Sequence, residues 1–327
     1  MTAPAPASPA TPPPAAAPRE VQVRFDSDGI NLAGTLTDVA APVAAVLVVT
    51  GSGKIDRDSN ARAIKVGVTK AVARALAQPE NSTAPAASLR YDKRGIGASS
   101  GDYRRAGMAD NLADARAGLD WLAGRLPGVP LLVAGHSEGT LYAAQLAASD
   151  PRVAGAVLLS APARSGERII DYQIETVVPR LPPVVKAITR LIRYDVARGQ
   201  HKRVERLKAS TGDVIRVGGV RANARWWRGF LSYDPSADLA RITVPVLAIT
   251  GGHDLQVPPE DVDAIGRLVR GPFEGHVAGD LSHLLRPDRE SVGPRGYRRE
   301  VRQPVSPEAL DLITAWVSRH WGPRTGG

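Results

Sequence analysis

Apolar residues follow two different periods along this chain, and these periods predict its elements. Near the start, Val21, Val23 and Phe25 alternate with polar residues, and a Ser-Asp-Gly turn separates them from a second apolar run. This pattern predicts an antiparallel hairpin. The next apolar run, VAAVLVV at 43–49, has no polar interruption. An uninterrupted run of this length predicts a strand that is buried on both faces of a parallel sheet.

Short apolar runs recur later in the chain, and segments with helical spacing lie between them. Further strands are expected within 86–92, 129–135, 153–162, 244–251 and 273–279. Helical spacing covers 59–77, 108–126 and 306–320. This alternation predicts right-handed crossovers, and therefore a mostly parallel, doubly wound α/β sheet with helices on both of its faces.

Residues 164–233 interrupt the alternation. Their most regular helical stretch, PVVKAITRLIRYDVAR at 183–198, has apolar residues on one side and basic residues toward the other. The apolar side consists of Val184, Ile188, Leu191 and Ile192. Because the segment lies between two core strands, we expect an inserted helical cap, with the core at 20–163 and 234–327.

The composition is typical of a globular protein with a large core, since 43% of the 327 residues are hydrophobic and 23% are charged. The chain has no cysteine, which excludes disulfides, thiol catalysis and cysteine-based metal sites. No apolar stretch reaches the roughly 18 residues of a membrane span, so none is expected.

Residues 1–19 are rich in alanine and proline and predict a disordered tail. They lack the basic start and the continuous apolar stretch of a secretory signal, so we expect a cytoplasmic protein. A tag or a remnant of processing is the alternative origin of this tail.

The formal net charge of +9 is concentrated in one segment. Residues 164–228 contain 15 lysines and arginines against 6 acidic residues, and the remainder is neutral overall. Solvated helix faces are one explanation for this excess. Attraction of an anionic substrate is the other. Nucleic-acid binding is not expected, because the segment contains no recognisable reading motif.

Two stretches match the spacing G-x-S-x-G, one centred on Ser99 and the other on Ser137. Ser137 follows the apolar run 131–134 and precedes a segment of high helix propensity. Strand, sharp turn and helix are the context of a nucleophile elbow, where small residues on either side of the serine permit a strained turn. Ser99 lies among polar residues, where its glycines indicate a loop. Ser137 is therefore the candidate nucleophile.

A serine hydroxyl needs a base within hydrogen-bond reach and a carboxylate that orients this base. In this type of sheet they follow the serine in the order acid, then histidine, each after a later strand. Asp254 follows a late core strand, whereas its rivals Asp261 and Asp263 lie at a predicted helix start. His283 lies in the loop after the last strand and is preferred over His276, which lies within that strand.

The tetrahedral intermediate of acyl transfer carries a negative oxygen, which needs backbone N–H donors already in place. One donor is expected from Glu138, directly after the candidate nucleophile, at a helix N-terminus. The other is expected from the loop TGSGKID at 50–56, where Ser52 is preferred and Gly53 is the alternative. A phosphate-cradling loop is excluded here, because the G-x-x-x-x-G-K pattern is absent.

Five stretches carry a family resemblance: TGSGKIDRDSN, LRYDKRGIGASSGD, GHSEG, YDPSADLARITVPVLAITGGHDLQVP and LSHLLRP. With them the chain resembles the α/β-hydrolase superfamily, and within it the bacterial carboxylesterases and serine-aminopeptidase-like hydrolases. The resemblance covers most of the chain apart from the cap. It implies a serine hydrolase without a cofactor, with Ser137, Asp254 and His283 as its triad and Ser52 and Glu138 as oxyanion donors.

One departure from the family lies in the oxyanion loop, which begins with Thr-Gly where many relatives have His-Gly. Because the donor is a backbone group, little loss is expected. Charged residues around this loop are expected to hold loops together by ion pairing; they are Asp56, Arg57, Asp58, Asp92 and Arg94.

The sequence thus predicts an enzyme that hydrolyses a small-molecule carboxylic ester through an acyl-enzyme, with no cofactor and no metal. The side chains of Trp226, Trp227 and Phe230 are expected either to line an acyl pocket or to pack the cap onto the core. A basic cap would suit an anionic thioester, and an acid such as Glu138 would suit a peptide N-terminus. A non-catalytic binding protein on the same scaffold is the rival from another class.

Overall fold

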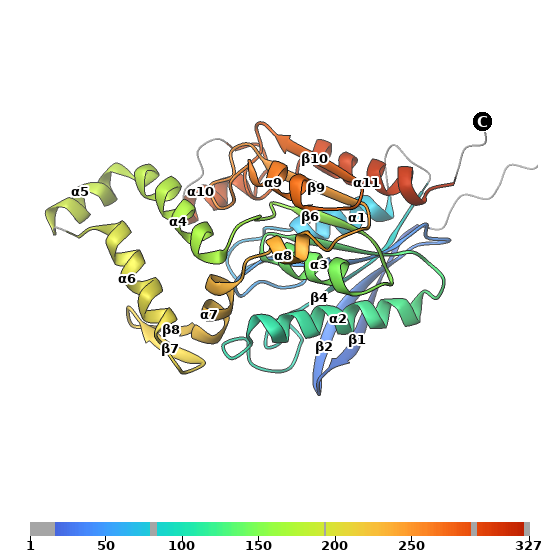
Figure 1. Cartoon of the computed structure of the whole chain (residues 1–327), viewed down its shortest axis with the longest axis horizontal. Coiled ribbons are helices and arrows are strands. Elements are labelled where there is room, and N and C mark those ends of the chain that lie inside the picture. The colour runs from blue at the N-terminus through green and yellow to red at the C-terminus, as the bar shows by residue number, and fades with distance from the viewer. Residues whose placement is uncertain (1–16, 79–83, 193, 289–292, 324–327) are drawn as a thin grey trace, which may run out of the picture.

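An eight-stranded sheet forms the centre of the molecule, shown as a computed structural model in Figure 1, with strand order β1-β2-β4-β3-β5-β6-β9-β10. The strands are β1 (Arg19–Ser27), β2 (Ile30–Asp38), β3 (Ala45–Val49), β4 (Ala87–Tyr91), β5 (Leu131–His136), β6 (Val153–Leu159), β9 (Val246–Gly251) and β10 (Phe273–Ala278). Strand β2 pairs antiparallel with β1 and β4, and the remaining neighbours in this sheet are parallel. The predicted mostly parallel sheet with an N-terminal hairpin is confirmed.

The structure describes residues 17–78, 84–192, 194–288 and 293–323. The predicted tail at 1–19 lies almost entirely outside these residues, and Arg19 already belongs to β1, where it pairs with Asp38. Within the described ranges, no helix combines the length and the apolar character needed to cross a membrane.

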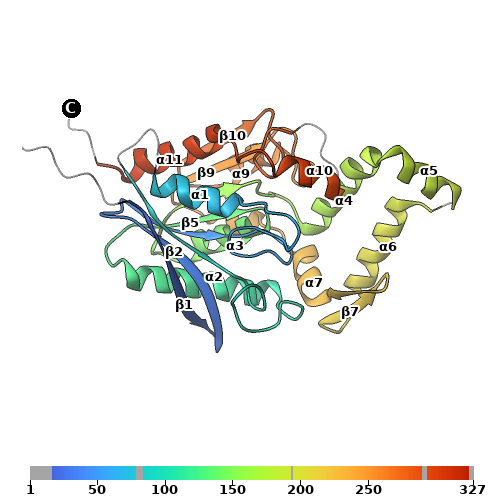
Figure 2. The same ribbon diagram turned by 180° about the vertical axis from the view of Figure 1, so that it is seen from behind.

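Helices cover both faces of the sheet. One face carries α1 (Val68–Ala77) and α11 (Pro307–Trp321), and the other carries α2 (Met108–Arg125), α3 (Glu138–Ser149) and α9 (Asp261–Leu268) (Figures 1 and 2). Successive strand residues point to opposite faces, so that Leu47 belongs to one apolar core and Val48 to the other. A strand between two cores is apolar at every position, which explains the uninterrupted runs in the sequence.

The first crossover helix begins later than its apolar spacing predicts. Helical spacing extends over 59–77, but α1 starts at Val68. Gly67 directly before it has a positive φ of 69°, and Ser59 has a positive φ of 65°. Backbone in the left-handed region does not continue a right-handed helix. Residues 50–67 therefore form a long loop at the carboxyl end of β3.

The segment 164–233, which we call the cap segment, lies beyond one end of the sheet (Figure 1). It contains α4 (Gly166–Val177), a 3-10 turn (Val178–Arg180), α5 (Pro183–Leu191), α6 (Val196–Lys208), β7 (Val214–Val217), β8 (Val220–Asn223) and α7 (Ala224–Ser232). Strands β7 and β8 form a hairpin with Gly218 and Gly219 at its turn, an addition to the expected helices. Two short helices complete the fold, α8 (Ser236–Leu239) after the cap segment and α10 (Gly293–Glu300) before α11.

The amphipathic stretch at 183–198 is divided between two helices. Helix α5 ends at Leu191, and Asp195 caps α6 by accepting a hydrogen bond from the backbone N–H of Arg198 at 2.9 Å. Apolar side chains on the outer side of α5 are exposed, Val184 at 68% and Leu191 at 83%. The apolar face that the sequence predicts is therefore present, but it covers none of the core.

Candidate active site

The backbone at Ser137 has the strained geometry of a strand-to-helix elbow. Ser137 lies between the end of β5 and the start of α3, and its φ and ψ are 55° and −123°. A residue other than glycine keeps such a conformation only where its surroundings enforce it. Glycines on both sides permit the turn: a Cβ at Gly135 would lie 2.4 Å from the backbone of Gly139, and one at Gly139 would lie 2.3 Å from the carbonyl oxygen of Val49.

The second serine with this spacing has a different role. The hydroxyl of Ser99 donates to the carbonyl oxygen of Asp92 at 2.7 Å and accepts from the backbone N–H of Ala33 at 2.9 Å. Both partners are main-chain groups of neighbouring segments. Ser99 therefore fastens its glycine-rich loop to β2, as the loop interpretation of its sequence expects.

The candidate acid and base lie in direct contact. Nδ1 of His283 is 2.8 Å from Oδ2 of Asp254, and both side chains are buried. The other carboxylate oxygen of Asp254 accepts from the backbone N–H groups of Gln256 at 2.7 Å and Val257 at 2.9 Å. A carboxylate held by these donors has a fixed orientation, and it leaves Nε2 of the imidazole for another partner.

Ser137 and His283 line the same small cavity. Its volume is about 140 Å³, and Gly51 and Ser52 from the loop after β3 line it as well. A Cβ built at Gly51 would lie 3.3 Å from Cβ of Ser137. The loop after β3, the elbow and the histidine loop thus meet at the carboxyl ends of β3, β5 and β10.

The main chain of the histidine loop is tied to the elbow. Nε2 of His136 donates to the carbonyl oxygen of His283 at 2.8 Å, and the hydroxyl of Ser160 donates to the same oxygen at 3.3 Å. Burial, together with the nearby His283 ring, lowers the pKa of His136 to about 3. His136 is therefore a neutral structural donor near pH 7.

The rival candidates have other partners. Nε2 of His276 lies 2.8 Å from Oε1 of Glu274, its neighbour on β10. Asp261 accepts from the backbone N–H of Ala163 at 2.9 Å and from Arg164, which fastens the start of the cap segment to α9. The described residues contain no cluster of three His, Cys, Asp or Glu side chains that could hold a metal ion.

A larger cavity extends from Ser137 to the cap segment. Its volume is about 300 Å³, and the aromatic side chains of Trp226, Trp227 and Phe230 line it. The rings of Trp226 and Phe230 are stacked with their centroids 4.9 Å apart. The same aromatics pack against α3 and α4, so they both line the cavity and hold the cap segment on the core.

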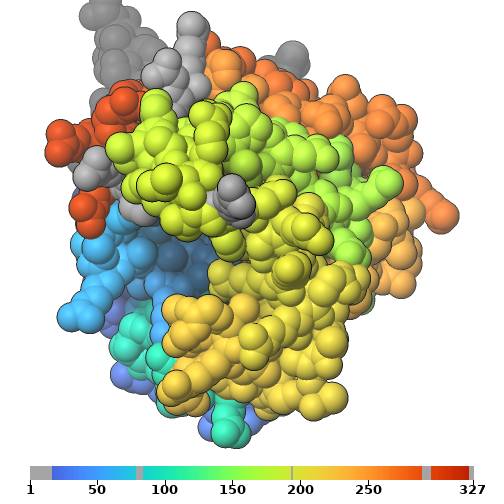
Figure 3. All heavy atoms as spheres, turned by 90° about the vertical axis from the view of Figure 1, so that its left-hand side faces the viewer, coloured from blue at the N-terminus to red at the C-terminus, as the bar shows by residue number. Residues whose placement is uncertain are grey.

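Seen from the cap side, the surface is hollowed between the cap segment and the blue N-terminal part of the chain (Figure 3).

The carboxylate of Glu138 is buried at the start of α3 and has several donors. Its Oε1 accepts from Nε1 of Trp226 at 2.6 Å, from Nδ2 of Asn111 at 3.4 Å and from the hydroxyl of Tyr142. Its Oε2 lies 3.7 Å from Nζ of Lys93. The carboxylate of Glu138 is therefore engaged by internal groups, chiefly through Oε1.

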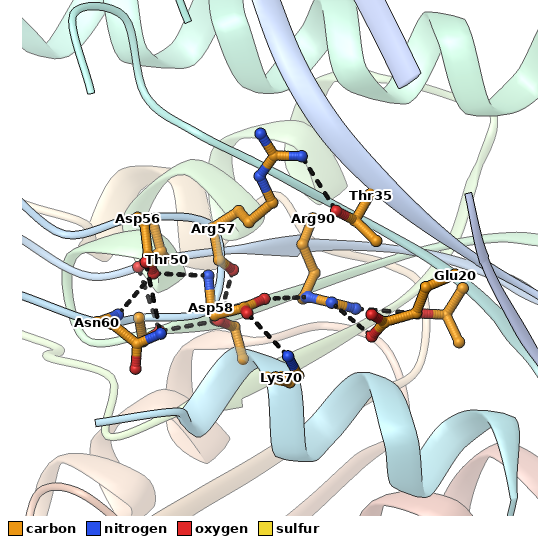
Figure 4. Close-up of polar contacts among 12 residues, drawn as sticks. Glu20, Thr35, Thr50, Asp56, Arg57, Asp58, Asn60, Lys70 and Arg90 are labelled. Carbon is orange, nitrogen blue, oxygen red and sulfur yellow. Dashed lines mark hydrogen bonds and ion pairs between the residues drawn. The ribbon is translucent and has the colours of Figure 1, made fainter. Parts of the chain in front are cut away.

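Ion pairs hold the loop after β3, as the sequence predicts for Arg57, Asp58 and Asp92. Arg57 pairs with Asp92 at 2.7 Å. Asp58 accepts from Nε of Arg90 at 3.1 Å and from Nζ of Lys70 at 3.2 Å (Figure 4). Arg94 binds Asp114 on α2. Asp56 differs from the prediction: its Oδ1 accepts from the backbone N–H groups of Asp58 at 3.0 Å and Asn60 at 2.8 Å, within its own loop.

Lys93 was not singled out by any sequence pattern. Its Nζ donates to the carbonyl oxygen of Gly51 at 2.7 Å, inside the site. In the sequence it stands between Asp92 and Arg94, where a solvated charge is the ordinary interpretation. The available signal was its position directly after a buried strand, at the same edge of the sheet as the elbow.

The strand order, the elbow after β5 and the inserted cap segment define the α/β-hydrolase fold. The chain belongs to the serine aminopeptidase S33 family (Hydrolase_4), whose family model matches residues 64–285. The loop that carries Ser52 precedes the matched residues.

Similar proteins include several named esterases. Esterase EstD of Thermotoga maritima is 22% identical over 285 residues, which are 86% of this chain and 64% of EstD. The chain thus spans just under two thirds of that relative. The Pyrococcus furiosus esterase Pf2001 has a TM-score of 0.60 at 17% identity, covering 94% of this chain and 92% of the other. Est1E of Butyrivibrio proteoclasticus, solved with ferulic acid bound, has a TM-score of 0.58 at 20% identity, covering 91% and 96%. Because the sequence identities to the two solved structures are 20% and 17%, their similarity to this chain establishes the fold alone.

Proposed function

We propose that this protein is a serine hydrolase that cleaves carboxylic esters through an acyl-enzyme. The observation that carries the proposal is the contact of Asp254 with His283 at 2.8 Å, beside a cavity that Ser137 also lines. These residues follow the chain order nucleophile, acid, histidine of this fold. The strained elbow that presents Ser137 supports the same assignment.

The proposed reaction has two halves. Oγ of Ser137 attacks the ester carbonyl carbon, and Nε2 of His283 takes the hydroxyl proton while Asp254 stabilises the imidazolium. The tetrahedral intermediate then breaks the bond to the alcohol oxygen, which leaves with the proton from His283. Water attacks the acyl-enzyme, gives a proton to His283, and releases the acid as that proton returns to Ser137.

Two backbone N–H groups are proposed to stabilise the oxyanion. The N–H of Glu138 lies at the N-terminus of the 12-residue helix α3, where the helix dipole favours negative charge. Ser52 borders both cavities that Ser137 lines, which supports it as the second donor. A single donor of this kind typically lowers the barrier by roughly 3 kcal/mol.

The acyl part of the substrate is proposed to lie against Trp226, Trp227 and Phe230. A further apolar cavity of about 330 Å³ lies inside the cap segment, between α4 and α6. It shares Ile170, Gln173 and Trp227 with the first cavity. These adjoining spaces favour an ester whose apolar acyl chain extends past Trp227.

An anionic thioester is the second candidate substrate, because the cap segment carries the positive charge of the chain. The names of EstD and Pf2001 support an ester instead. A peptide N-terminus has the least support, since the carboxylate of Glu138 is already bound by internal donors.

Turnover of a substrate panel tests the proposal. Purified protein would be assayed with p-nitrophenyl esters, acyl-CoA thioesters and aminoacyl arylamides. We expect the highest kcat/KM with esters, and loss of this activity in Ser137→Ala. Turnover of thioesters or arylamides alone, or equal ester hydrolysis by Ser137→Ala, would contradict it.

A further inference from the structure

Lys93 is buried beside the proposed oxyanion hole, and the mechanism above gives it no task. Its side chain is only 4% exposed. Its Nζ donates to the carbonyl oxygen of Gly51 at 2.7 Å, lies 3.7 Å from Oε2 of Glu138, and lies 5.6 Å from the ring centroid of Tyr103. Lysines are rarely buried unless their charge is paired, because desolvation of an ammonium is costly. Such a position therefore needs an explanation.

The contact with Gly51 involves the peptide group that carries the proposed donor, the N–H of Ser52. The carbonyl of Gly51 and the N–H of Ser52 belong to one planar, trans peptide group, so they point in opposite directions. Because the Lys93 ammonium holds the carbonyl oxygen of Gly51, the N–H of Ser52 is fixed on the side away from Lys93. A positive charge on the oxygen also polarises the peptide and makes its N–H a stronger donor.

Glu138 connects Lys93 with the other proposed donor. The backbone N–H of Glu138 is the other proposed oxyanion donor. The side-chain carboxylate of Glu138 pairs with Lys93 and accepts a hydrogen bond from Trp226 of the cap segment at 2.6 Å. Burial lowers the pKa of Lys93, and the charge of Glu138 opposes this change. The pair thus favours a charged ammonium at Gly51. One buried ion pair fastens both donors relative to each other.

The rest of the loop has anchors of its own. Arg57 binds Asp92. Asp58 binds Arg90 and Lys70 (Figure 4). None of these three contacts involves Lys93. Loss of its ammonium should therefore free the peptide at Ser52 and leave the loop in place.

We propose that Lys93 is a positioning residue that orients the peptide between Gly51 and Ser52 to stabilise the oxyanion. This inference rests on the proposed hydrolase function. The carbonyl oxygen of the substrate becomes negative only as the tetrahedral intermediate forms. The contribution of Lys93 therefore appears in the transition state and is small in the ground state.

The variant Lys93→Met removes the ammonium and keeps most of the side-chain volume. With p-nitrophenyl butyrate we expect kcat to fall about 10- to 100-fold and KM to change less than about 3-fold. A trifluoromethyl ketone, whose adduct with serine carries the oxyanion, should lose affinity by a similar factor. The matched amide, which binds without forming the adduct, should keep its affinity.

Lys70→Met is the matched control, because Lys70 contacts the same loop through Asp58. It should leave kcat and ketone affinity unchanged. Circular dichroism and thermal unfolding check that each variant is folded, and Lys93→Leu replaces Lys93→Met if the latter does not fold.

The inference is overturned if the Lys93 variant keeps kcat within about 3-fold of the wild type. Equal loss of affinity for ketone and amide also overturns it, because that result indicates a general structural role. Failure of the hydrolase function itself is distinguishable: the wild-type protein would then neither hydrolyse the ester nor bind the ketone.

Discussion

His283 and Asp254 lie 29 positions apart in the sequence, yet their side chains meet at 2.8 Å. Their strands explain the contact, because β9 and β10 are parallel neighbours and the loops after them leave the sheet side by side. Both side chains are at most 7% exposed. The pair is therefore held in one geometry, as the proposed role of His283 as the base requires.

Replacement of His283 by alanine should reduce ester kcat/KM at least about 10⁴-fold, because the serine would lose its base. The matched control is His276→Ala, on β10, where the ring contacts Glu274 of the same strand. This control should stay within about 2-fold of the wild type in the same p-nitrophenyl butyrate assay. If kcat/KM falls equally in both variants, His283 is not the base.

His136 should make the stability of the protein depend on pH. Burial and the His283 ring lower its pKa to about 3, whereas a histidine in an unfolded chain has a pKa of about 6.5. Between these values the unfolded state binds more protons, so stability falls as the pH falls from about 6.5 toward 3. The slope from this one group approaches roughly 1.4 kcal/mol per pH unit.

Urea unfolding between about pH 7 and pH 4 measures this slope. His136→Gln keeps an N–H donor toward the carbonyl of His283 and should flatten the slope by roughly 1 kcal/mol per pH unit. His201→Gln is the control, since His201 is exposed on α6. An identical slope in wild type and His136→Gln would show that His136 does not cause the dependence.

The cavity between α4 and α6 should determine how long an acyl chain the protein accepts. Val204 is buried in its wall, and Val204→Trp would fill the space. We expect kcat/KM for p-nitrophenyl decanoate to fall about 10-fold or more, with little change for the acetate. Val184→Trp, on the exposed side of α5, should change neither value. Equal effects on both esters would place the acyl chain elsewhere.

The positive charge of the cap segment should favour anionic substrates. Arg203 borders the same cavity, and Arg203→Gln should raise KM for an ester with a carboxylated acyl chain about 3-fold more than for a neutral ester of equal length. Added salt should reduce this difference. If KM rises equally for both esters, the charge has no part in substrate selection.

The strands and the elbow could be predicted from the sequence because their signals are local. A strand between two cores is apolar throughout, and the glycines around Ser137 are required by backbone contacts that no side chain permits. Asp254 and His283 were candidates because each follows a strand, and parallel strands bring their carboxyl ends to one edge.

Other features depend on contacts between distant segments or on short local signals. The spacing at 59–77 resembles a helix throughout, and only the left-handed backbone at Ser59 and Gly67 delays the start of α1. The hairpin of β7 and β8 had a usable signal in the Gly218-Gly219 pair, which follows the β-branched residues Val214, Ile215 and Val217. For Lys93 the only signal in the sequence was its position at the end of a buried strand, because its contacts are with Gly51 and Glu138, which are far away in sequence.

Covalent labelling with a fluorophosphonate tests most directly whether Ser137 is the nucleophile. After incubation and proteolysis, mass spectrometry should find one phosphonyl group on the peptide that contains Ser137. Ser137→Ala should remain unlabelled, and His283→Ala should react far more slowly than the wild type. Labelling of Ser137→Ala at the wild-type rate, or modification of another serine alone, would contradict the proposed mechanism.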